Sequence, residues 1–296
     1  MYRYILLILS IVLSGSLFAS GKDTTSPRQI SIMTYNVKLL PRGATWIHHH
    51  PVKRARLIPA KVLEDHPDVV VFEEAFDGVS VRLLKKGLRS AYPYMAGQHN
   101  RRLVTYKRAG GVLIFSRYPM QELESIKYSQ CKGADCYGHK GAILVQVEHP
   151  AGRIQVLGTH LQAGGSVDLK ASQYIEAAGL LDRHQQQGVP QFIAGDFNTH
   201  KDDTLLYNRL TTAMKGADGD VDDELKILTA HTLNDLRRKN NGHPKKSKSI
   251  IDYVFVKANG AHITSQHRYT REYQQPWSQT NKDLSDHFAV ILDVRM

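Results

Sequence analysis

Short apolar runs recur along the chain, and most of them end in polar residues that can take part in chemistry. Residues 29–35 alternate apolar and polar side chains before Asn36, whereas residues 69–72 form a continuous apolar run before Glu73 and Glu74. The first pattern is typical of a half-buried strand and the second of a buried one. The same reasoning predicts further strands at residues 112–115, 142–147, 153–157, 191–194, 250–256 and 288–294.

Segments with helical spacing separate some of these runs. Residues 54–65 are predicted to form one helix, which Pro67 ends, and Asp168 is predicted to cap a longer helix. The apolar face of the longer helix is predicted to consist of Ala171, Tyr174, Ile175, Ala178 and Leu181. Because strands and helices alternate, the sequence predicts a mixed α/β protein.

The polar residues at the strand ends are the first indication of function. Carboxylates, amides and imidazoles at the ends of different strands can meet at one mouth of a sheet scaffold, where strands hold each side chain and loops shape the pocket. A single Glu after a strand is usually just solvated. Six such endings in one chain instead predict an active site.

The first residues have the composition of a secretory signal peptide. Arg3 supplies a positive charge, residues 5–18 are mostly apolar, and small residues follow at 19–21. An uncleaved anchor is the alternative, although the apolar run is short for a membrane span. We expect residues 1–19 to be a signal peptide and residues 28–296 to be one catalytic domain of a secreted protein, extracellular or periplasmic.

The chain has two cysteines, Cys131 and Cys136. In an exported protein such a close pair can form a disulfide bond. A zinc site is the alternative, but no His or second Cys pair completes one. We expect a disulfide that adds local rigidity more than global stability.

The formal net charge is +11 at pH 7, and basic residues are concentrated in residues 237–248. Basic surfaces attract anionic partners such as nucleic acid, acidic lipid or cell-surface polyanions. We expect contacts with anionic polymers through residues 237–248, with a solvated loop as the equal alternative. Charge alone does not choose a substrate.

Six short motifs occur in one order along the chain. They are TYNV (residues 34–37), EEAF (73–76), GTHL (158–161), GDFN (195–198), IDYVFV (251–256) and SDH (285–287). Together they resemble the endonuclease/exonuclease/phosphatase superfamily, also called DNase-I-like, over essentially the whole mature chain. This resemblance implies an α/β fold of four layers, in which two packed β-sheets are flanked by helices.

The resemblance also implies a metal site. Glu74 would be the principal ligand of Mg²⁺, with Asn36 nearby and Asp286 beside the metal, and Mn²⁺ or Co²⁺ are possible substitutes. Hard oxygen ligands together with water suit Mg²⁺. Glu73 is the alternative ligand, because it stands where many relatives carry an amide.

The acid–base and phosphate-binding groups follow from the same resemblance. His287 would take a proton from the attacking water, and Asp252 would orient and charge its imidazole ring. Asp196 and Asn198 would position the water and hold the phosphoryl oxygens, while His160 would bind the phosphate and stabilise the leaving oxygen. A divalent ion would neutralise the charge that develops in the transition state.

Other segments indicate which substrate the protein acts on, because the superfamily fold alone does not determine the substrate. TYNVKLLP, GGVLIFSRYP (110–119), the stretch 131–141 and GTHLQA (158–163) resemble bacterial neutral sphingomyelinases. In that family Lys140 would contact the phosphate; a surface lysine is the alternative. The resemblance implies hydrolysis of sphingomyelin to ceramide and phosphocholine at a sphingomyelin-containing membrane, by a monomer without an obligate protein partner.

Two other functions remain open on the sequence. A secreted Mg²⁺-dependent endonuclease would explain the basic charge, whereas the complete set of catalytic residues argues against an inactive lipid-binding module. The interval between IDY and SDH holds Tyr269, Tyr273 and Trp277 but also charged residues, so it is less apolar than a strong membrane-inserting hairpin. We expect bilayer contact through charge and Trp277, or a preference for dispersed lipid.

Overall fold

The computed structural model of the protein describes residues 29–41, 49–97, 111–221, 228–231, 234–238 and 248–296. The expected signal peptide and most of the basic segment 237–248 therefore lie outside the described residues. Among the helices that are described, none combines the length and the apolar character needed to cross a membrane.

Most strands belong to two sheets. The first sheet has the order β12-β13-β1-β2-β4-β3, and the second has the order β11-β8-β7-β6-β5. The strands of the first are β1 (Gln29–Leu39), β2 (Val69–Ala75), β3 (Tyr94–Gly97), β4 (Leu113–Ser116), β12 (Ser265–Arg271) and β13 (Ala289–Arg295). Those of the second are β5 (Met120–Lys127), β6 (Gly141–His149), β7 (Gly152–His160), β8 (Gln191–Asp196) and β11 (Asp252–Lys257). The short strands β9 (Ala230–His231) and β10 (Lys248–Ser249) form a separate two-stranded sheet.

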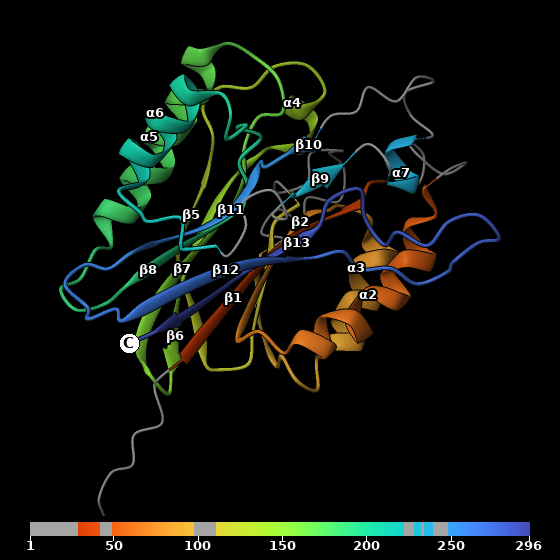
Figure 1. The fold of residues 1–296 in the computed structure, drawn as a ribbon, viewed down its shortest axis with the longest axis horizontal. Coiled ribbons are helices and arrows are strands. Elements are labelled where there is room, and N and C mark those ends of the chain that lie inside the picture. The colour runs from red at the N-terminus through yellow and green to blue at the C-terminus, as the bar shows by residue number, and fades with distance from the viewer. Residues whose placement is uncertain (1–28, 42–48, 98–110, 222–227, 232–233, 239–247) are drawn as a thin grey trace, which may run out of the picture.

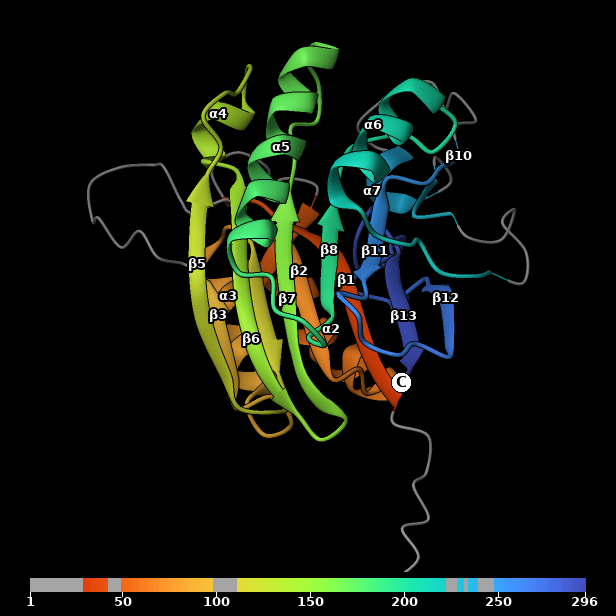
Figure 2. The same cartoon turned by 90° about the vertical axis from the view of Figure 1, so that its left-hand side faces the viewer.

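Helices cover the outer faces of the two sheets (Figures 1 and 2). Helices α2 (Pro51–Asp65) and α3 (Gly78–Leu88) pack on the first sheet, and α5 (Val167–Arg183) and α6 (Thr204–Met214) pack on the second. The inner faces share an apolar core that includes Ile32, Val71, Val156 and Phe192. The short helices are α4 (Asp135–Gly138) and α7 (Asp235–Arg238). The expected four-layer α/β sandwich is thus confirmed.

The first strand shows why both faces of this sheet are apolar. Ile30 and Ile32 of β1 point into the core between the sheets, whereas Met33, Tyr35 and Val37 pack towards α2 and α3. Because a strand alternates its side chains and both faces are covered, β1 is buried throughout most of its length. The prediction of a half-buried strand over 29–35 was therefore wrong about its burial and its end.

Three details of the helices also differ from expectation. Helix α2 begins at Pro51, one turn before residue 54, because proline is favoured at a first helical position. Ser166, rather than Asp168, caps α5 by accepting a hydrogen bond from the Leu169 amide. Ile175, predicted to be on the apolar face of α5, is 68% exposed.

Candidate functional site

Strand register places three polar residues of the second sheet in a row. His160 at the end of β7 lies opposite Asp196 at the end of β8, and Asp252 of β11 lies opposite Asp196 on the other side. Gly195 makes this close approach possible, because a Cβ atom there would be 2.0 Å from the backbone oxygen of Thr159. The pairing explains why motifs far apart in sequence converge on one place.

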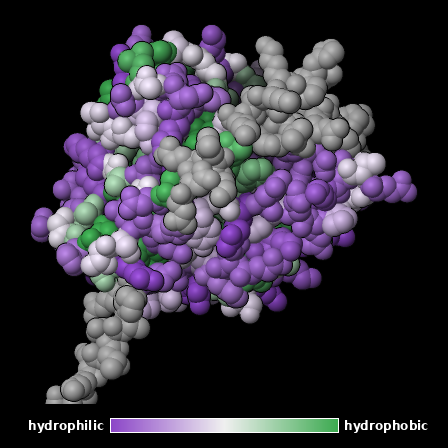
Figure 3. Space-filling view, viewed as in Figure 1, coloured by the Kyte–Doolittle hydropathy of each residue, from purple (hydrophilic) through white to green (hydrophobic). Residues whose placement is uncertain are grey.

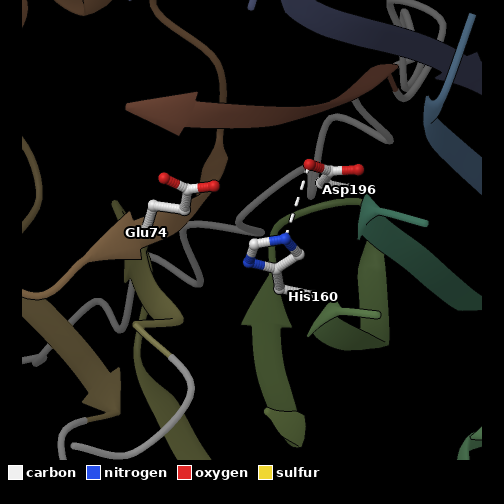
Figure 4. Close-up of side chains that lie close together, drawn as sticks. All are labelled: Glu74, His160 and Asp196. Atoms are coloured by element: carbon white, nitrogen blue, oxygen red, sulfur yellow. Dashed lines mark ion pairs between the residues drawn. The ribbon is translucent and has the colours of Figure 1, made fainter. Parts of the chain in front are cut away.

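The first sheet contributes Glu74, not Glu73, to the same place. Asn36 and Glu73 are paired across β1 and β2, after which the register shifts and Glu74 adopts a left-handed φ of 55°. This backbone conformation is costly for a residue other than glycine and is often found at functional sites. It turns the Glu74 side chain towards His160 and Asp196, as Figure 4 shows.

Glu73 has a different hydrogen-bond partner. Its side chain is fully buried, and its Oε1 accepts a hydrogen bond of 2.6 Å from the hydroxyl of Thr34. Burial raises the pKa of Glu73 well above the usual value for a glutamate. The geometry therefore favours Glu74 as the metal ligand of the EEAF motif.

Asn36 lies between two carboxylates. Its Nδ2 donates to Oε1 of Glu74 at 3.1 Å and to Oδ2 of Asp196 at 3.0 Å, while its Oδ1 accepts from the Lys38 amide at 3.1 Å. In this arrangement Asn36 holds the two carboxylates together through its amide nitrogen. A metal ligand role, which we expected from the sequence, would require its oxygen.

The described residues include two clusters that could hold a metal ion: Glu74 with His160 and Asp196, and Asp196 with Asp252 and His287. Burial, and after it the charge of Asp286, raises the pKa of Glu74. Burial and the neighbouring Asp252 raise the pKa of Asp196 to about 6. Carboxylates that lie close together in a poorly solvated site repel one another, and a hard divalent cation bound to their oxygens relieves this repulsion. The residues of these clusters therefore fit such an ion.

His287 and Asp252 form the expected pair. Nδ1 of His287 is 2.9 and 3.1 Å from the two carboxylate oxygens of Asp252, and its Nε2 is 3.9 Å from Oδ2 of Asp196. Burial opposes the charged form, but the carboxylates of Asp252 and Asp196 outweigh it and raise the pKa of His287 to about 10. A cation bound by Asp196 would offset part of that negative charge and bring the imidazole towards its neutral, basic form.

His160 is surrounded by donors. Lys140 Nζ lies 2.9 Å and Asn198 Nδ2 lies 3.1 Å from Nε2 of His160, and Asp196 Oδ2 lies 3.5 Å from it. Burial, together with the positive charges of Lys140 and His287, keeps the pKa of His160 well below its usual range. A neutral ring with its proton on Nδ1 lets Nε2 accept from Lys140 and Asn198, whereas Nδ1 has no hydrogen-bond partner among the described residues.

The SDH motif is attached to the end of β1. Asp286 Oδ2 lies 2.6 Å from Nζ of Lys38, and the hydroxyl of Ser285 donates to the backbone oxygen of Asn36. Asp286 thus lies at the site, as expected, with Lys38 as its ion-pair partner. Lys38 was not predicted from the sequence, although its position directly after the TYNV motif indicates that it lies near the site.

Two buried cations from helices also reach the site and were missed. Arg54 of α2 donates to backbone oxygens at the end of β1 and in the loop before Ser285. Lys170 of α5 donates to the backbone oxygen of Asn198, which has a left-handed φ of 48°. Charged residues in helices are usually solvated, so nothing in the sequence pattern distinguishes these two.

Trp277 is not available for membrane contact, contrary to expectation. Its side chain is 7% exposed, packs in the core beside α2, and donates from Nε1 to the backbone oxygen of Asp283. Tyr273 is also buried, and its hydroxyl donates to Asp65. The aromatic residues of this interval therefore stabilise the fold.

The expected disulfide is present, since Cys131 and Cys136 are bonded. Lys140, the expected phosphate contact, is 6% exposed and contacts His160, so the alternative of a surface lysine was wrong.

Comparison with known proteins identifies the family. The sequence model of the family described as Endonuclease/Exonuclease/phosphatase family matches residues 33–287 of this chain. A protein from Leptospira interrogans named sphingomyelinase C is 31% identical over 195 residues, which cover 58% of this chain and 34% of that relative. Sphingomyelinase C from Listeria ivanovii is 25% identical over 300 residues, which cover 90% of this chain and 86% of that relative. The chain thus spans a minor part of the Leptospira sequence and most of the Listeria one.

Solved structures share the fold. Beta toxin from Staphylococcus aureus superimposes with a TM-score of 0.78 at 22% identity, over 89% of this chain and 99% of the toxin. A mutant of that toxin with bound magnesium ions gives a TM-score of 0.72 at 20% identity, over 89% of this chain and 99% of the mutant.

Proposed function

Because the chain belongs to the endonuclease/exonuclease/phosphatase family, we propose that it is a secreted, Mg²⁺-dependent phosphodiesterase that hydrolyses sphingomyelin to ceramide and phosphocholine. The observation that carries this proposal is the Asp252–His287 pair beside the partly buried carboxylate of Glu74 and the buried carboxylate of Asp196. A base held by a carboxylate, next to a cation site, is suited to activating water for attack on a phosphodiester.

The chain's own residues perform the proton transfer. Asp252 holds Nδ1–H of His287, so that Nε2 accepts a proton from the attacking water. The new phosphorus–oxygen bond forms as the bond to the ceramide oxygen breaks. The leaving oxygen takes up a proton from solvent water, and His287 then releases to solvent the proton that it accepted. His160 and Asn198 bind the phosphoryl oxygens, and His160 stabilises the leaving oxygen.

Glu74 and Asp196 would hold the cation, with Asp286 and Asn36 beside them. When bound, Mg²⁺ supplies positive charge that stabilises the anionic transition state. The bound magnesium ions in the related toxin support the choice of Mg²⁺. Asn36 can serve as a ligand if its amide turns over, which would also release its two hydrogen bonds to the carboxylates.

Lys140 would bind the phosphate by exchanging one of its present acceptors for a phosphoryl oxygen. Its Nζ donates to His160 and to the backbone oxygen of Leu161, and it lies 3.2 Å from Asp135. A buried ammonium beside the catalytic imidazole supplies the positive charge that a phosphodiester anion needs.

The choice of sphingomyelin rests on the names of the relatives and on the sequence segments that resemble them. Membrane contact would involve exposed apolar side chains other than Trp277. The most exposed among the described residues are Tyr137, Ile175 and Leu205. Figure 3 shows a largely hydrophilic face with small hydrophobic patches, which fits transient contact with a bilayer better than deep insertion.

The test is an assay of the chain from Ser20 onward, with Mg²⁺, on sphingomyelin vesicles and on plasmid DNA. We expect phosphocholine release that both EDTA and the His287→Ala substitution abolish, with the DNA intact. His262→Ala, which removes an exposed imidazole, is the matched control and should keep full activity. Phosphocholine release that persists in folded His287→Ala would contradict the mechanism.

A secreted endonuclease is the second candidate, and the net charge of +11 favours it. In that case plasmid DNA would be nicked while the vesicles remain intact, and DNA binding would weaken steeply with salt because bound phosphates release counterions. Activity on neither substrate, with binding to vesicles retained, would support an inactive lipid-binding module.

A further inference from the structure

The disulfide loop, defined as residues 131–136, lies beside the phosphate-binding part of the proposed site. The bond joins Cys131 to Cys136, and Cys131 is exposed to solvent. Only four residues separate the two cysteines, so the bond restricts the backbone of the loop tightly. One of those four, Asp135, is also the first residue of helix α4.

Polar side chains attach this loop to the segment that follows His160. Gln162 accepts from the Lys132 amide and donates to the Lys132 backbone oxygen, both at 3.0 Å. Gln173 of α5 accepts from the Gln162 amide and donates to the backbone oxygen of Gln130, both at 2.9 Å. The loop is therefore docked at its start by side chains that are themselves buried.

Asp135 makes the connection to the catalytic groups. Its Oδ2 accepts a hydrogen bond of 2.8 Å from the Ala163 amide, and its Oδ1 is 3.2 Å from Nζ of Lys140. Lys140 in turn donates to Nε2 of His160 at 2.9 Å and to the Leu161 backbone oxygen at 2.7 Å. These three acceptors match the three N–H groups of the ammonium, so they define where it points.

We propose that Asp135 is a positioning residue that orients Lys140 against His160, and that the Cys131–Cys136 disulfide holds Asp135 in place for this purpose. The inference rests on the proposed function, since it assumes that Lys140 and His160 bind the phosphoryl group. The disulfide then serves the geometry of the active site rather than the stability of the fold.

Loss of the Asp135 carboxylate would leave the Lys140 ammonium with two hydrogen-bond acceptors. The Lys140 side chain could then adopt other rotamers, which its ion pair with Asp135 now prevents. A misplaced cation costs transition-state stabilisation, because positioning errors of about 1 Å can lower rates by about a hundredfold. We therefore expect kcat for phosphodiester hydrolysis to fall by about tenfold to a hundredfold in Asp135→Asn. The asparagine oxygen can still accept from the Ala163 amide, so the substitution chiefly removes the contact with Lys140.

The decisive measurement is a double-mutant cycle of Asp135→Asn with Lys140→Met. We expect Asp135→Asn to lower kcat strongly in the native background and hardly at all in Lys140→Met, because the residue that it positions is then absent. Equal losses in both backgrounds would overturn the proposal. Asp168→Asn removes a carboxylate that is 97% exposed, and it should leave kcat unchanged.

The disulfide is tested with Cys131→Ser/Cys136→Ser and with reductant. We expect either treatment to lower kcat, with no further loss when Asp135→Asn is added. Thiol reductant should not affect the serine variant. Full activity of the folded serine variant would overturn the role of the disulfide.

A readout independent of activity separates this inference from the proposed function. Hydrogen exchange of the Ala163 amide should become faster in the serine variant, because its acceptor Asp135 is no longer held; unchanged exchange would contradict the coupling. Kinetics should be measured with sphingomyelin and with a chromogenic phosphodiester. Wild-type hydrolysis of the chromogenic ester alone would reject sphingomyelin as substrate and still allow the double-mutant cycle to be completed.

Discussion

The burial of a charged side chain can be explained in this protein by the partners that the side chain has. Arg54 is fully buried, and its guanidinium donates to four backbone oxygens, those of Val37, Lys38, His49 and Leu284. Burial, partly offset by Tyr35, lowers the pKa of Arg54 to about 10, so it stays charged at neutral pH. It joins the end of β1 to the loop that carries the SDH motif.

Replacing Arg54 by Met should therefore destabilise the protein by about 3–5 kcal/mol, because buried carbonyl groups lose their donors. Urea unfolding of the variant measures this loss. Arg183→Met is the matched control: Arg183 is about half exposed and paired with Glu124 on the surface, so its loss should destabilise the protein far less. Similar losses for both variants would contradict the role assigned to Arg54.

The neighbouring glutamates of the EEAF motif allow a matched comparison. Glu74→Gln should lower Mg²⁺-dependent activity by about a hundredfold or more, because a negative ligand for the cation is lost. Glu73→Gln should stay within about threefold of wild type, since an amide oxygen can accept from Thr34 as the carboxyl does. Titration of the activity of each variant with Mg²⁺ checks both expectations. A larger loss of activity in Glu73→Gln than in Glu74→Gln would make Glu73 the ligand.

Among the elements, α5 shows how an unfavourable charge can be compensated. Asp182 lies near the C-terminal end of the helix, where the helix dipole disfavours a negative charge. Its carboxylate is 2.6 Å from Lys257 at the end of β11 and 3.1 Å from Lys215 after α6. These lysines tie the helix layer to the second sheet at the end away from the site.

The hydrogen bond from Lys257, with that from Lys215, lowers the pKa of Asp182 below its usual value. A carboxylate with a lowered folded-state pKa stabilises the protein above its unfolded pKa of about 3.9, and this contribution is lost as the pH falls through the folded value. Asp182→Asn should cost about 0.5–1 kcal/mol at pH 7, because the carboxylate is partly exposed.

The measurement is the thermal unfolding of wild type and Asp182→Asn between pH 7 and pH 2. The difference in Tm should shrink below about pH 4. A difference that is constant down to pH 2 would indicate lost packing instead of lost charge.

At the scale of the whole molecule, the two sheets share one core. Ile114 of β4 is fully buried and lies against Gly158 of β7, where a Cβ atom would be 3.1 Å from its Cδ1. Because each sheet buries its inner face only against the other, neither half has a complete core of its own. Unfolding should therefore be a single transition.

Ile114→Ala tests this shared core. It should lower the free energy of unfolding by about 2–5 kcal/mol, through lost burial and the cavity left behind. Circular dichroism and tryptophan fluorescence should still report coincident transitions in urea. Separate transitions would show that the sheets unfold independently.

Much of this arrangement could be predicted locally. The strands that end in motifs were found because their apolar residues are continuous or alternate with polar ones, and Asp196, Asp252 and His287 were recognised from those motifs. Helices α3 and α6 were missed although their buried residues recur at helical spacing, as Leu206, Leu210 and Met214 do in α6. Strands β5 and β12 were missed because their sequences mix polar and apolar residues without a clear period. Their burial depends on what covers them.

The sequence by itself determined the mixed α/β class through its periodicity. Its short motifs indicated the family, and through that resemblance the layered architecture and the chemical groups of the site, because periodicity and motifs are local properties of the chain. Only the tertiary structure decided that Glu74 faces the site while Glu73 does not, since this depends on a left-handed turn at the end of β2. It also decided that Trp277 is buried and that Asp135 reaches Lys140. These outcomes depend on which segments, distant in sequence, pack together, and a local sequence pattern does not determine that packing.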